Sequence, residues 1–453
     1  MTDSTVRPSA VFYRSPNDEY PVFVHADGYR IRDAEGTELI DLTSGISGAA
    51  IIGQGSDAVA KAMVDQVGKI SYAHTTGATT PAQEELAYRL TSLAPEGIDR
   101  VVFSSGGSEA NEIAMRITRQ YHLARGEPDR WKIISLYPSY HGATAAALSM
   151  TGRWDINRDY EPYLFGSRKV MAPVSFRGPY RGLSAEEVAI QAANALVVAI
   201  ESEGPESVAA FIAEPIALST GMAVPPPGYW MRVREICDRY GVVFIVDEVL
   251  TGMGRTGRFL CLDHWDVSAD ITTLSKGLGG GYVALGATLV RDFIAETIGA
   301  ENRKMAEVHT YSGSAQACAI GIAILDIIEQ NDLIEGSARK GELLEVWLTD
   351  YLSGLPWVGD VRGMGLFRGL EYVPADNPQG RFSAVSGISA AITKAMWSRG
   401  FLSRTMHHNN SVVSDVTTIA PALTISEADL EQGVIALADS ISQSGPLWNT
   451  DGS

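Results

Sequence analysis

Short, almost uninterrupted apolar runs separated by helix-like segments limit the fold of this chain more than any other feature. The clearest runs are Val208 to Ala213 and Val242 to Val246, which lack the polar alternation of a strand with one face in water. Such strands are typical of parallel sheets that helices cover on both faces. We therefore predict an α/β arrangement for the middle of the chain, with further strands at Arg100 to Ser104, Trp131 to Tyr137, Ile271 to Ser275 and Leu285 to Arg291.

The segments around these strands carry the start and stop signals of helices. Pro226 and Pro227 are expected to open one helix, and Gly241 is expected to close it. Near the end of the chain, Ser426 and Asp429 have the spacing of a capping box. The residues that follow the box repeat on one helical face: Leu430, Val434, Leu437 and Ile441.

The last third of the chain differs in character from the middle. Residues 360–373 (DVRGMGLFRGLEYV) predict a pair of strands, with which a second layer begins. We expect a large α/β domain at residues 61–335 and a smaller α+β domain assembled from both chain ends. Residues 1–60 would join the small domain, whose C-terminal part would span residues 336–453.

The composition argues against several classes of function. A formal charge of −18, from 54 acidic and 36 basic residues, disfavours a nucleic-acid groove. The cysteines Cys237, Cys261 and Cys318 lack C-x-x-C spacing, so neither a disulfide framework nor a metal cluster is expected. The apolar runs fall short of the roughly 20 residues that cross a bilayer, and no signal peptide is indicated. We expect a cytoplasmic protein that handles small molecules.

Lys276 is the sharpest chemical clue in the sequence. It stands at the end of an apolar strand, and four glycines follow within the next five residues. A lysine partly withdrawn from water in a cleft has a lowered pKa and can form a Schiff base with an aldehyde cofactor. A solvated lysine beside a flexible turn explains this segment equally well when it is taken alone.

A second clue lies in the run Val242 to Val249 (VVFIVDEV), which carries Asp247 and Glu248 to the carboxyl end of a buried strand. Ligands of open α/β sheets bind outside that edge. A carboxylate there can keep a pyridine nitrogen protonated, which makes a cofactor ring an electron sink. An acidic pair that caps the next turn is the simpler alternative.

Two further loops are expected at the same edge of the sheet. Ser104 to Glu112 (SSGGSEANE) suits a phosphate at a helix N-terminus, although Ser108 could simply cap that helix. Tyr140 could stack on a cofactor ring with His141 beside it, although such a pair more often serves packing. Together the four segments favour a planar aldehyde with a protonatable ring nitrogen and a phosphate, and pyridoxal 5′-phosphate (PLP) has these parts.

Taken together, these segments resemble the class III, fold type I, PLP-dependent aminotransferases, from about residue 30 to about residue 430. The matching motifs are Gly107 to Asn111, Tyr140 to Gly142, Ala213 to Pro215, Asp247 to Val249 with Gly252 to Gly257, Ser275 to Gly277, Thr310 to Gly313 and Arg362 to Leu366. The resemblance implies a mostly parallel sheet like that of aspartate aminotransferase.

The resemblance also implies roles around the cofactor ring. Lys276 would carry PLP and then shuttle the proton between substrate carbon and cofactor carbon. Asp247 would pair with the pyridinium nitrogen. Tyr140 would stack on one face of the ring and Val249 would pack on the other.

At the phosphate, the resemblance assigns binding to Gly107 and Ser108, helped by Thr310 from a neighbouring subunit. That last role implies a homodimer, possibly arranged further as a tetramer, with shared active sites. Glu214 matches a family glutamate near the cofactor edge, and His141 lies close to it without an assigned role.

The sequence departs from the family pattern where substrates bind. Gly106 stands where many relatives have serine, and Ser219 stands where the ornithine and 4-aminobutyrate branch has a glutamate. Arg404 matches the mobile arginine that receives a substrate carboxylate in ω-amine:pyruvate enzymes, but a polar stretch, His407 to Ser414, follows it. Gly45 to Gly48 has small residues where amine-specific relatives often place a tryptophan.

The expected activity is therefore a ping-pong transamination. An amine or amino acid and PLP would give a carbonyl product and pyridoxamine phosphate, and a keto acid such as pyruvate would restore PLP. Racemases, epimerases and dialkylglycine decarboxylases of the same fold are the nearest alternatives. A non-catalytic PLP-fold protein would be free to lose Lys276 and Asp247, and a nucleotide-binding enzyme has only the glycine-rich turns in its favour.

Overall fold

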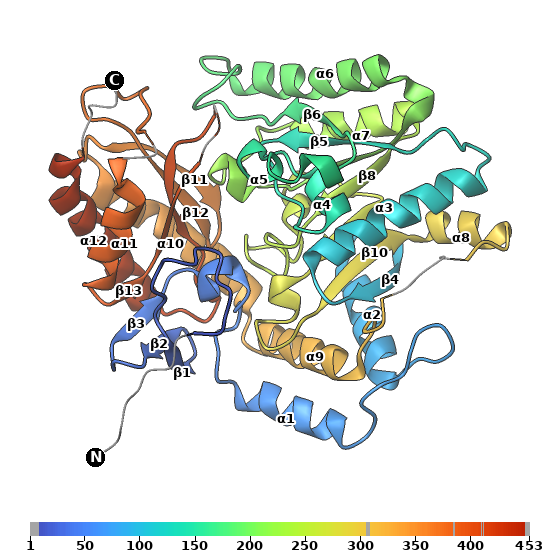
Figure 1. Cartoon of the computed structure of the whole chain (residues 1–453), viewed down its shortest axis with the longest axis horizontal. Coiled ribbons are helices and arrows are strands. Elements are labelled where there is room, and N and C mark those ends of the chain that lie inside the picture. Colours follow the sequence, from blue (N-terminus) through green and yellow to red (C-terminus); the bar gives the residue numbers. More distant parts are fainter. Residues whose placement is uncertain (1–8, 305–308, 384–385, 409, 411, 449–453) are drawn as a thin grey trace.

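The computed structural model describes residues 9–304, 309–383, 386–408, 410 and 412–448. At its centre is a seven-stranded sheet with the strand order β4-β10-β9-β8-β7-β5-β6 (Figure 1). The strands are β4 (Ile98–Ser104), β5 (Lys132–Tyr137), β6 (Arg168–Met171), β7 (Val208–Ala213), β8 (Val243–Asp247), β9 (Ile271–Leu274) and β10 (Gly286–Arg291). All run parallel except β10, which is antiparallel to both of its neighbours.

This sheet confirms the predicted α/β class and all six predicted strands, with ends shifted by at most two residues. The prediction missed β6, a four-residue strand at the edge of the sheet. Its sequence, RKVM, begins with two cations, so it lacks the apolar run that marks the central strands.

Helices cover both faces of the central sheet. On one face pack α6 (Ala185–Glu203) and α7 (Tyr229–Tyr240), and on the other pack α3 (Gly107–Ala124), α4 (Ala145–Met150) and α8 (Asp292–Ala300). Successive strand residues point to opposite faces of the sheet. Phe211 packs in the apolar cluster that contains α6 and α7, and Ile212 packs in the cluster that contains α3, α4 and α8. This double burial explains why β7 and β8 are apolar throughout. Of the further helices, α9 (Ala315–Gln330) packs against α1 (Asp57–Val67) and α2 (Pro81–Leu93), and α2 packs against β4.

The predicted helix near Pro226 is α7, but it begins later than expected. It starts at Tyr229, because Gly228 has a φ of 81° and the chain must turn there before helical geometry can begin. Its end is as predicted, since Gly241 closes the helix in the left-handed conformation with a φ of 64°.

Two smaller sheets stand beside the central one. The first has the antiparallel order β11-β12-β15-β14, and its first two strands are the pair predicted at residues 360–373. Its strands are β11 (Val358–Met364), β12 (Phe367–Tyr372), β14 (Arg404–His407) and β15 (Asp415–Ile419). Three helices accompany them: α10 (Leu333–Leu352), α11 (Ile388–Trp397) and α12 (Glu427–Ser444).

The second small sheet joins the two ends of the chain. It has the order β1-β2-β3-β13, with β1 (Phe23–Asp27), β2 (Arg30–Asp33), β3 (Glu38–Asp41) and β13 (Phe401–Leu402). β13 pairs in parallel with β3, so the N-terminal strands lie against the C-terminal part of the chain, as Figure 1 shows. This pairing supports a small domain built from both ends, and the boundaries at residues 60 and 335 stay a proposal.

The capping box predicted for α12 forms only in part. Ser426 Oγ accepts from the backbone N–H of Asp429 at 3.1 Å, as expected. The Asp429 carboxylate does not return to the Ser426 backbone, because Tyr29 and Arg30 of the N-terminal strands donate to it, both at 2.7 Å. The four apolar residues predicted on one face of this helix are all buried.

Candidate active site

A cavity of about 1100 Å³ lies at the carboxyl ends of the parallel strands. Lys276 follows β9, Asp247 ends β8, Glu214 follows β7, and all three line this cavity together with Arg404 of β14. The structure thus brings to one place the groups that the sequence placed after separate strands. This is the edge at which open α/β sheets bind their ligands.

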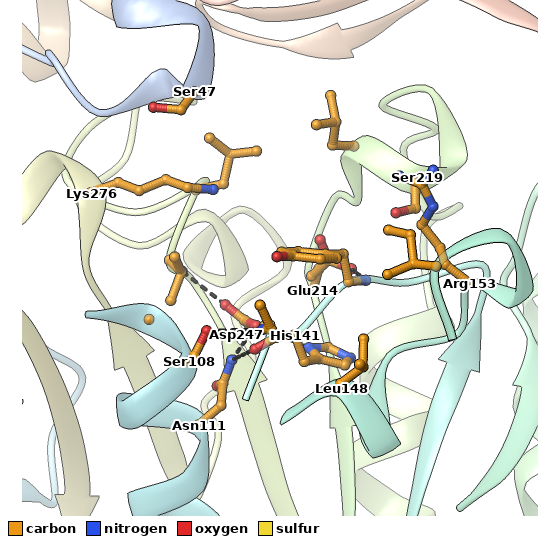
Figure 2. Close-up of a pocket in the computed structure, with 18 of the residues that line it drawn as sticks. Ser47, Ser108, Asn111, His141, Leu148, Arg153, Glu214, Ser219, Asp247 and Lys276 are labelled. Atoms are coloured by element: carbon orange, nitrogen blue, oxygen red, sulfur yellow. Dashed lines mark hydrogen bonds and ion pairs between the residues drawn. The ribbon is translucent and has the colours of Figure 1, made fainter. Parts of the chain in front are cut away.

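Lys276 extends its amine into the cavity, as Figure 2 shows. Its backbone has a φ of 41°, in the left-handed region that residues with a side chain rarely occupy. Removal from water lowers the pKa of the Lys276 ammonium, and the nearby carboxylates of Asp247 and Glu214 offset part of that effect. More of the amine is therefore neutral and nucleophilic than for a lysine in water.

Asp247 is held by three hydrogen-bond donors. Its Oδ2 accepts from Asn111 Nδ2 at 2.7 Å and from His141 Nδ1 at 2.9 Å, and its Oδ1 accepts from the backbone N–H of Val249 at 3.0 Å. These contacts, marked in part in Figure 2, fix the orientation of the carboxylate at the cavity wall. Glu248, not Asp247, has the turn-capping role that the sequence left open for this acidic pair. Its carboxylate accepts hydrogen bonds from Thr251 Oγ1 and from the Leu262 backbone N–H.

Asn111 is a positioning residue that belongs to the motif Gly107 to Asn111, but the sequence alone did not predict its role. Its Nδ2 donates to Asp247 and to the His141 carbonyl, and its Oδ1 accepts from Thr273 Oγ1 at 2.8 Å. The clue was available in the sequence, because Asn111 lies four residues after Gly107 and thus on the same face of α3. The structure also gives His141 a contact, since its Nδ1 bonds to Asp247.

The N-terminus of α3 forms another part of the cavity wall. Its N-cap, Gly106, has no side chain to cap the helix, and Gly107 and Ser108 line the cavity. The first N–H groups of a helix lack intrahelical partners and favour an anion. Ser108 does not serve as the plain cap considered above, because its Oγ accepts from the backbone N–H of Ala143 at 3.1 Å.

Adding a methyl group at Gly107 should weaken the site, whereas adding one at Gly106 should not. A Cβ at Gly107 would lie 2.7 Å from Val249 Cγ1. A Cβ at Gly106 would have no neighbouring atom within 4 Å. We expect Gly107→Ala to weaken PLP binding roughly tenfold and Gly106→Ala less than about twofold. Titration of each apoprotein with PLP, followed by absorbance, measures both affinities, and equal affinities would contradict the prediction.

Glu214 and Tyr140 meet beside the cavity. The Tyr140 backbone N–H donates to Glu214 Oε2 at 2.9 Å, and both residues line the cavity. Burial, reinforced by the charge of Asp247, raises the pKa of the Glu214 carboxyl above its ordinary range. Glu214 is therefore easier to keep protonated than an exposed glutamate.

Thr310 differs from the other predicted residues, since it is exposed and is not among the described residues that line this cavity. Its carbonyl accepts from the Tyr72 hydroxyl at 3.0 Å, which ties it to the surface near the end of α1. A contribution of Thr310 to the site of a neighbouring subunit stays a prediction.

Arg404 lines the cavity and donates from Nη1 to the Ile46 carbonyl at 2.9 Å. Burial lowers the pKa of its guanidinium, and the cations Arg14 and Arg153 add to that effect. In the polar stretch that follows Arg404, His407 also lines the cavity, whereas positions 409 and 411 lie outside the described residues.

The described part of the chain offers neither a metal site nor a membrane span. No three or more of its His, Cys, Asp and Glu residues gather as metal ligands. None of its helices combines the length and the apolar character needed to cross a bilayer.

The fold and this site define a PLP-dependent transferase of fold type I. The sequence profile described as aminotransferase class-III matches residues 13–441, and the chain belongs to this family. A probable aminotransferase of Mycobacterium tuberculosis is 35% identical over 89% of this chain and 86% of its own length. The putrescine–pyruvate aminotransferase of Pseudomonas aeruginosa is 30% identical over 92% of this chain and 89% of its own.

Solved structures lead to the same family. The amine transaminase of an uncultivated Pseudomonas species, solved in its PLP-bound form, is 32% identical and has a TM-score of 0.89. The match covers 98% of this chain and 99% of that one. The protein is thus an aminotransferase that depends on PLP, as the sequence predicted.

The residues present suit that cofactor. A lysine amine, a carboxylate held by hydrogen bonds and an uncapped helix N-terminus line one cavity, and they match the aldehyde, the ring nitrogen and the phosphate of PLP. At Gly107 the close approach of the Val249 side chain leaves no room for a Cβ, so a glycine here lets the start of α3 pack against Val249 at the cavity wall.

Proposed function

We propose that the protein transfers an amino group from an amine or amino acid, including ω-amino acids, to a keto acid such as pyruvate by a ping-pong mechanism. The observation that carries this proposal is the convergence of Lys276, Asp247 and Arg404 on one cavity. The first two suit the cofactor, and the arginine suits the carboxylate of a keto acid. The putrescine–pyruvate enzyme of Pseudomonas aeruginosa supports pyruvate as the acceptor.

Each wall of the cavity has a part in the proposed reaction. PLP, when bound, supplies an electron sink for the negative charge that develops on the substrate carbon. Lys276 holds the cofactor covalently and, once the substrate amine displaces it, moves the proton between substrate carbon and cofactor carbon. Asp247, fixed by its three donors, keeps the ring nitrogen protonated.

The remaining predicted residues position the cofactor in this proposal. Gly107 and Ser108 bind the phosphate at the start of α3, and Tyr140 and Val249 enclose the ring. Glu214, whose raised pKa favours the neutral form, lies near the cofactor edge without adding a full negative charge.

The test is a spectrum of the purified protein before and after adding a panel of amines and amino acids. A donor that bleaches the visible band of bound PLP and yields an equal amount of carbonyl product establishes transamination. Recovery of the band on adding pyruvate completes the ping-pong cycle. A racemase or epimerase would form no keto product, and a decarboxylase would release carbon dioxide, so either result contradicts the proposal.

We also propose a homodimer with shared sites, located in the cytosol. A group of large apolar side chains is exposed along α1 and the residues after it: Met63, Val64, Val67, Ile70 and Tyr72. Tyr72 bonds to Thr310, whose neighbour Tyr311 is also exposed. An exposed apolar surface of this kind is typical of a protein interface, and it would carry Thr310 towards the partner.

A dimer that combines one Lys276→Ala subunit with one Thr310→Glu subunit should be active, although each variant alone should be inactive. Lys276→Ala removes the attachment point, and Thr310→Glu places a carboxylate against the phosphate in the partner's site. A heterodimer isolated through two different tags has one site with both native residues, so about half of the wild-type activity is expected. Full activity of Thr310→Glu alone, or no recovery in the heterodimer, would show that the sites are not shared.

A further inference from the structure

A second arginine lies in the wall of the cavity. Arg153 directly precedes α5 (Trp154–Asn157), and 18% of its side chain is exposed. Figure 2 shows it beside Ser219, across the cavity from Lys276. Nothing in the handling of the cofactor requires a cation at this place, so Arg153 is available to the substrate.

The guanidinium of Arg153 is held in a fixed orientation. Its Nε donates to Asp155 Oδ1 at 3.1 Å and its Nη2 donates to Asp155 Oδ2 at 2.5 Å. This pairing uses one edge of the planar group and leaves the edge between Nη1 and Nη2 without a partner among the described residues. An arginine edge of this kind binds a carboxylate through two parallel hydrogen bonds.

The charge on this side of the cavity also favours an anion. Arg14 and Arg404 line it together with Arg153, and both Arg14 and Arg153 contribute to the lowered pKa of Arg404. Among the acidic residues that line the cavity, Asp155 pairs with Arg153, and Asp159 pairs with Arg158 at 3.4 Å. Glu214 also interacts with Arg153, but burial raises the pKa of its carboxyl and so favours the neutral form. Cations therefore remain in excess, and an incoming anion relieves their mutual repulsion.

Between the two ends, the cavity offers apolar walls. Ser219 beside Arg153 is buried and uncharged. The apolar residues that line the cavity include Leu148, Ile156, Ile216, Leu218 and Leu250. Such walls suit methylene groups, so a substrate with an amine at one end and an acidic group at the other matches the distribution of polar groups.

We propose that Arg153 binds the distal acidic group of the amino donor, so that the preferred donors are ω-amino acids. This inference rests on the proposed transamination and specifies its donor. Arg404, which donates to the Ile46 carbonyl, then serves the carboxylate of the keto acid in the second half-reaction. Two arginines in one cavity allow the acidic group of the donor and that of the keto acid to bind to different residues.

The test compares donors that differ only in the acidic group. Single-turnover rates of the PLP-loaded enzyme are measured with 4-aminobutyrate and 5-aminopentanoate, and with butylamine and pentylamine as neutral partners. For Arg153→Met we expect kcat/KM to fall roughly 10- to 100-fold with the two acids and to stay within about threefold with the two amines. The half-reaction with pyruvate should also stay within about threefold.

Matched variants separate a role in binding from a role in folding. Arg339→Met removes an exposed arginine that does not line the cavity and should leave all four donors unaffected. Equal losses with acids and amines in Arg153→Met, or no loss at all, would overturn the proposal. A selective loss of the ω-amino acids in Arg404→Ala, but not in Arg153→Met, would also overturn it.

A binding measurement distinguishes failure of this inference from failure of the proposed function. Calorimetric titration of the PLP-loaded protein with pentanoate, which has no amino group, should show binding that weakens roughly tenfold or more in Arg153→Met. If the wild type binds pentanoate through Arg153 but transaminates no amine, the anion subsite stands and the proposed function fails. If transamination occurs and Arg153→Met binds pentanoate as the wild type does, only the subsite fails.

Discussion

Lys276→Ala is expected to eliminate measurable transamination while the protein remains folded. The proton transfer that a positioned acid/base group supplies is alone worth about 10² to 10⁴ in rate, and the covalent attachment of the cofactor is lost as well. The amine of Lys276 extends into the cavity from a residue in the left-handed conformation, and no other lysine lines that cavity in the described part of the chain.

The measurement combines a spectrum with rates. The variant should bind PLP without the absorbance of a covalently held cofactor, and its rate should fall by at least about 10⁴-fold with every donor. Alanine has no positive charge to bury, so the thermal transition should move little. An unchanged visible band in the variant would mean that another group holds the cofactor.

Lys340 provides a matched control. It is also a buried lysine, and its amine donates to the carbonyls of Leu423 and Ile425 in a region outside the cavity. Removal of this amine leaves two carbonyl groups without their donor, so Lys340→Gln should lower the melting temperature. The same variant should retain the cofactor band and a rate close to that of the wild type.

The second large effect is expected for Asp247→Asn. The side-chain amide keeps the shape of the carboxylate but loses the charge that stabilises a protonated ring nitrogen. The amide also has one oxygen where three donors now converge, so its NH₂ group must face either the Val249 N–H or the donors from Asn111 and His141. We expect kcat/KM to fall on the order of 10²- to 10³-fold.

Glu248→Gln is the matched control for Asp247. The two acids are adjacent and both are buried, but Glu248 points to Thr251 and Leu262 and does not line the cavity. Burial raises the pKa of Glu248 to about 7, so its neutral form is already well populated and glutamine is a close mimic. Rates within about threefold of wild type are expected, and equal losses in the two variants would contradict the role of Asp247.

The strands of the central sheet could be predicted because a strand buried on both faces needs apolar residues at successive positions, and this pattern is visible in the sequence. Runs such as Val208 to Ala213 are apolar at every position, which is required of a strand covered on both faces. The prediction missed β6, because its two cations at the sheet edge interrupt the apolar pattern. The start of α7 was missed for a different reason, since Gly228 adopts a left-handed turn that the preceding prolines do not reveal.

Much of the candidate site followed from the same local pattern. A polar residue directly after an apolar strand lies at the sheet edge, and this placed Lys276 and Asp247 at the cavity without any knowledge of their partners. The family resemblance then supplied the pairing of each residue with a part of PLP. The contacts between residues that hold Asp247 were not predicted, because a hydrogen bond between two side chains has no periodic signature.

Local sequence therefore determined the α/β class, the strands and the two residues most closely tied to the cofactor, because burial and strand ends depend on neighbours in the chain. Tertiary structure alone decided which distant residues meet. Asn111 reaches Asp247 across 136 positions, Arg404 reaches the Ile46 carbonyl across 358, and Arg153 enters the same cavity from a separate loop. These contacts depend on how the central sheet packs against the two chain ends. The sequence of a single segment does not specify that packing.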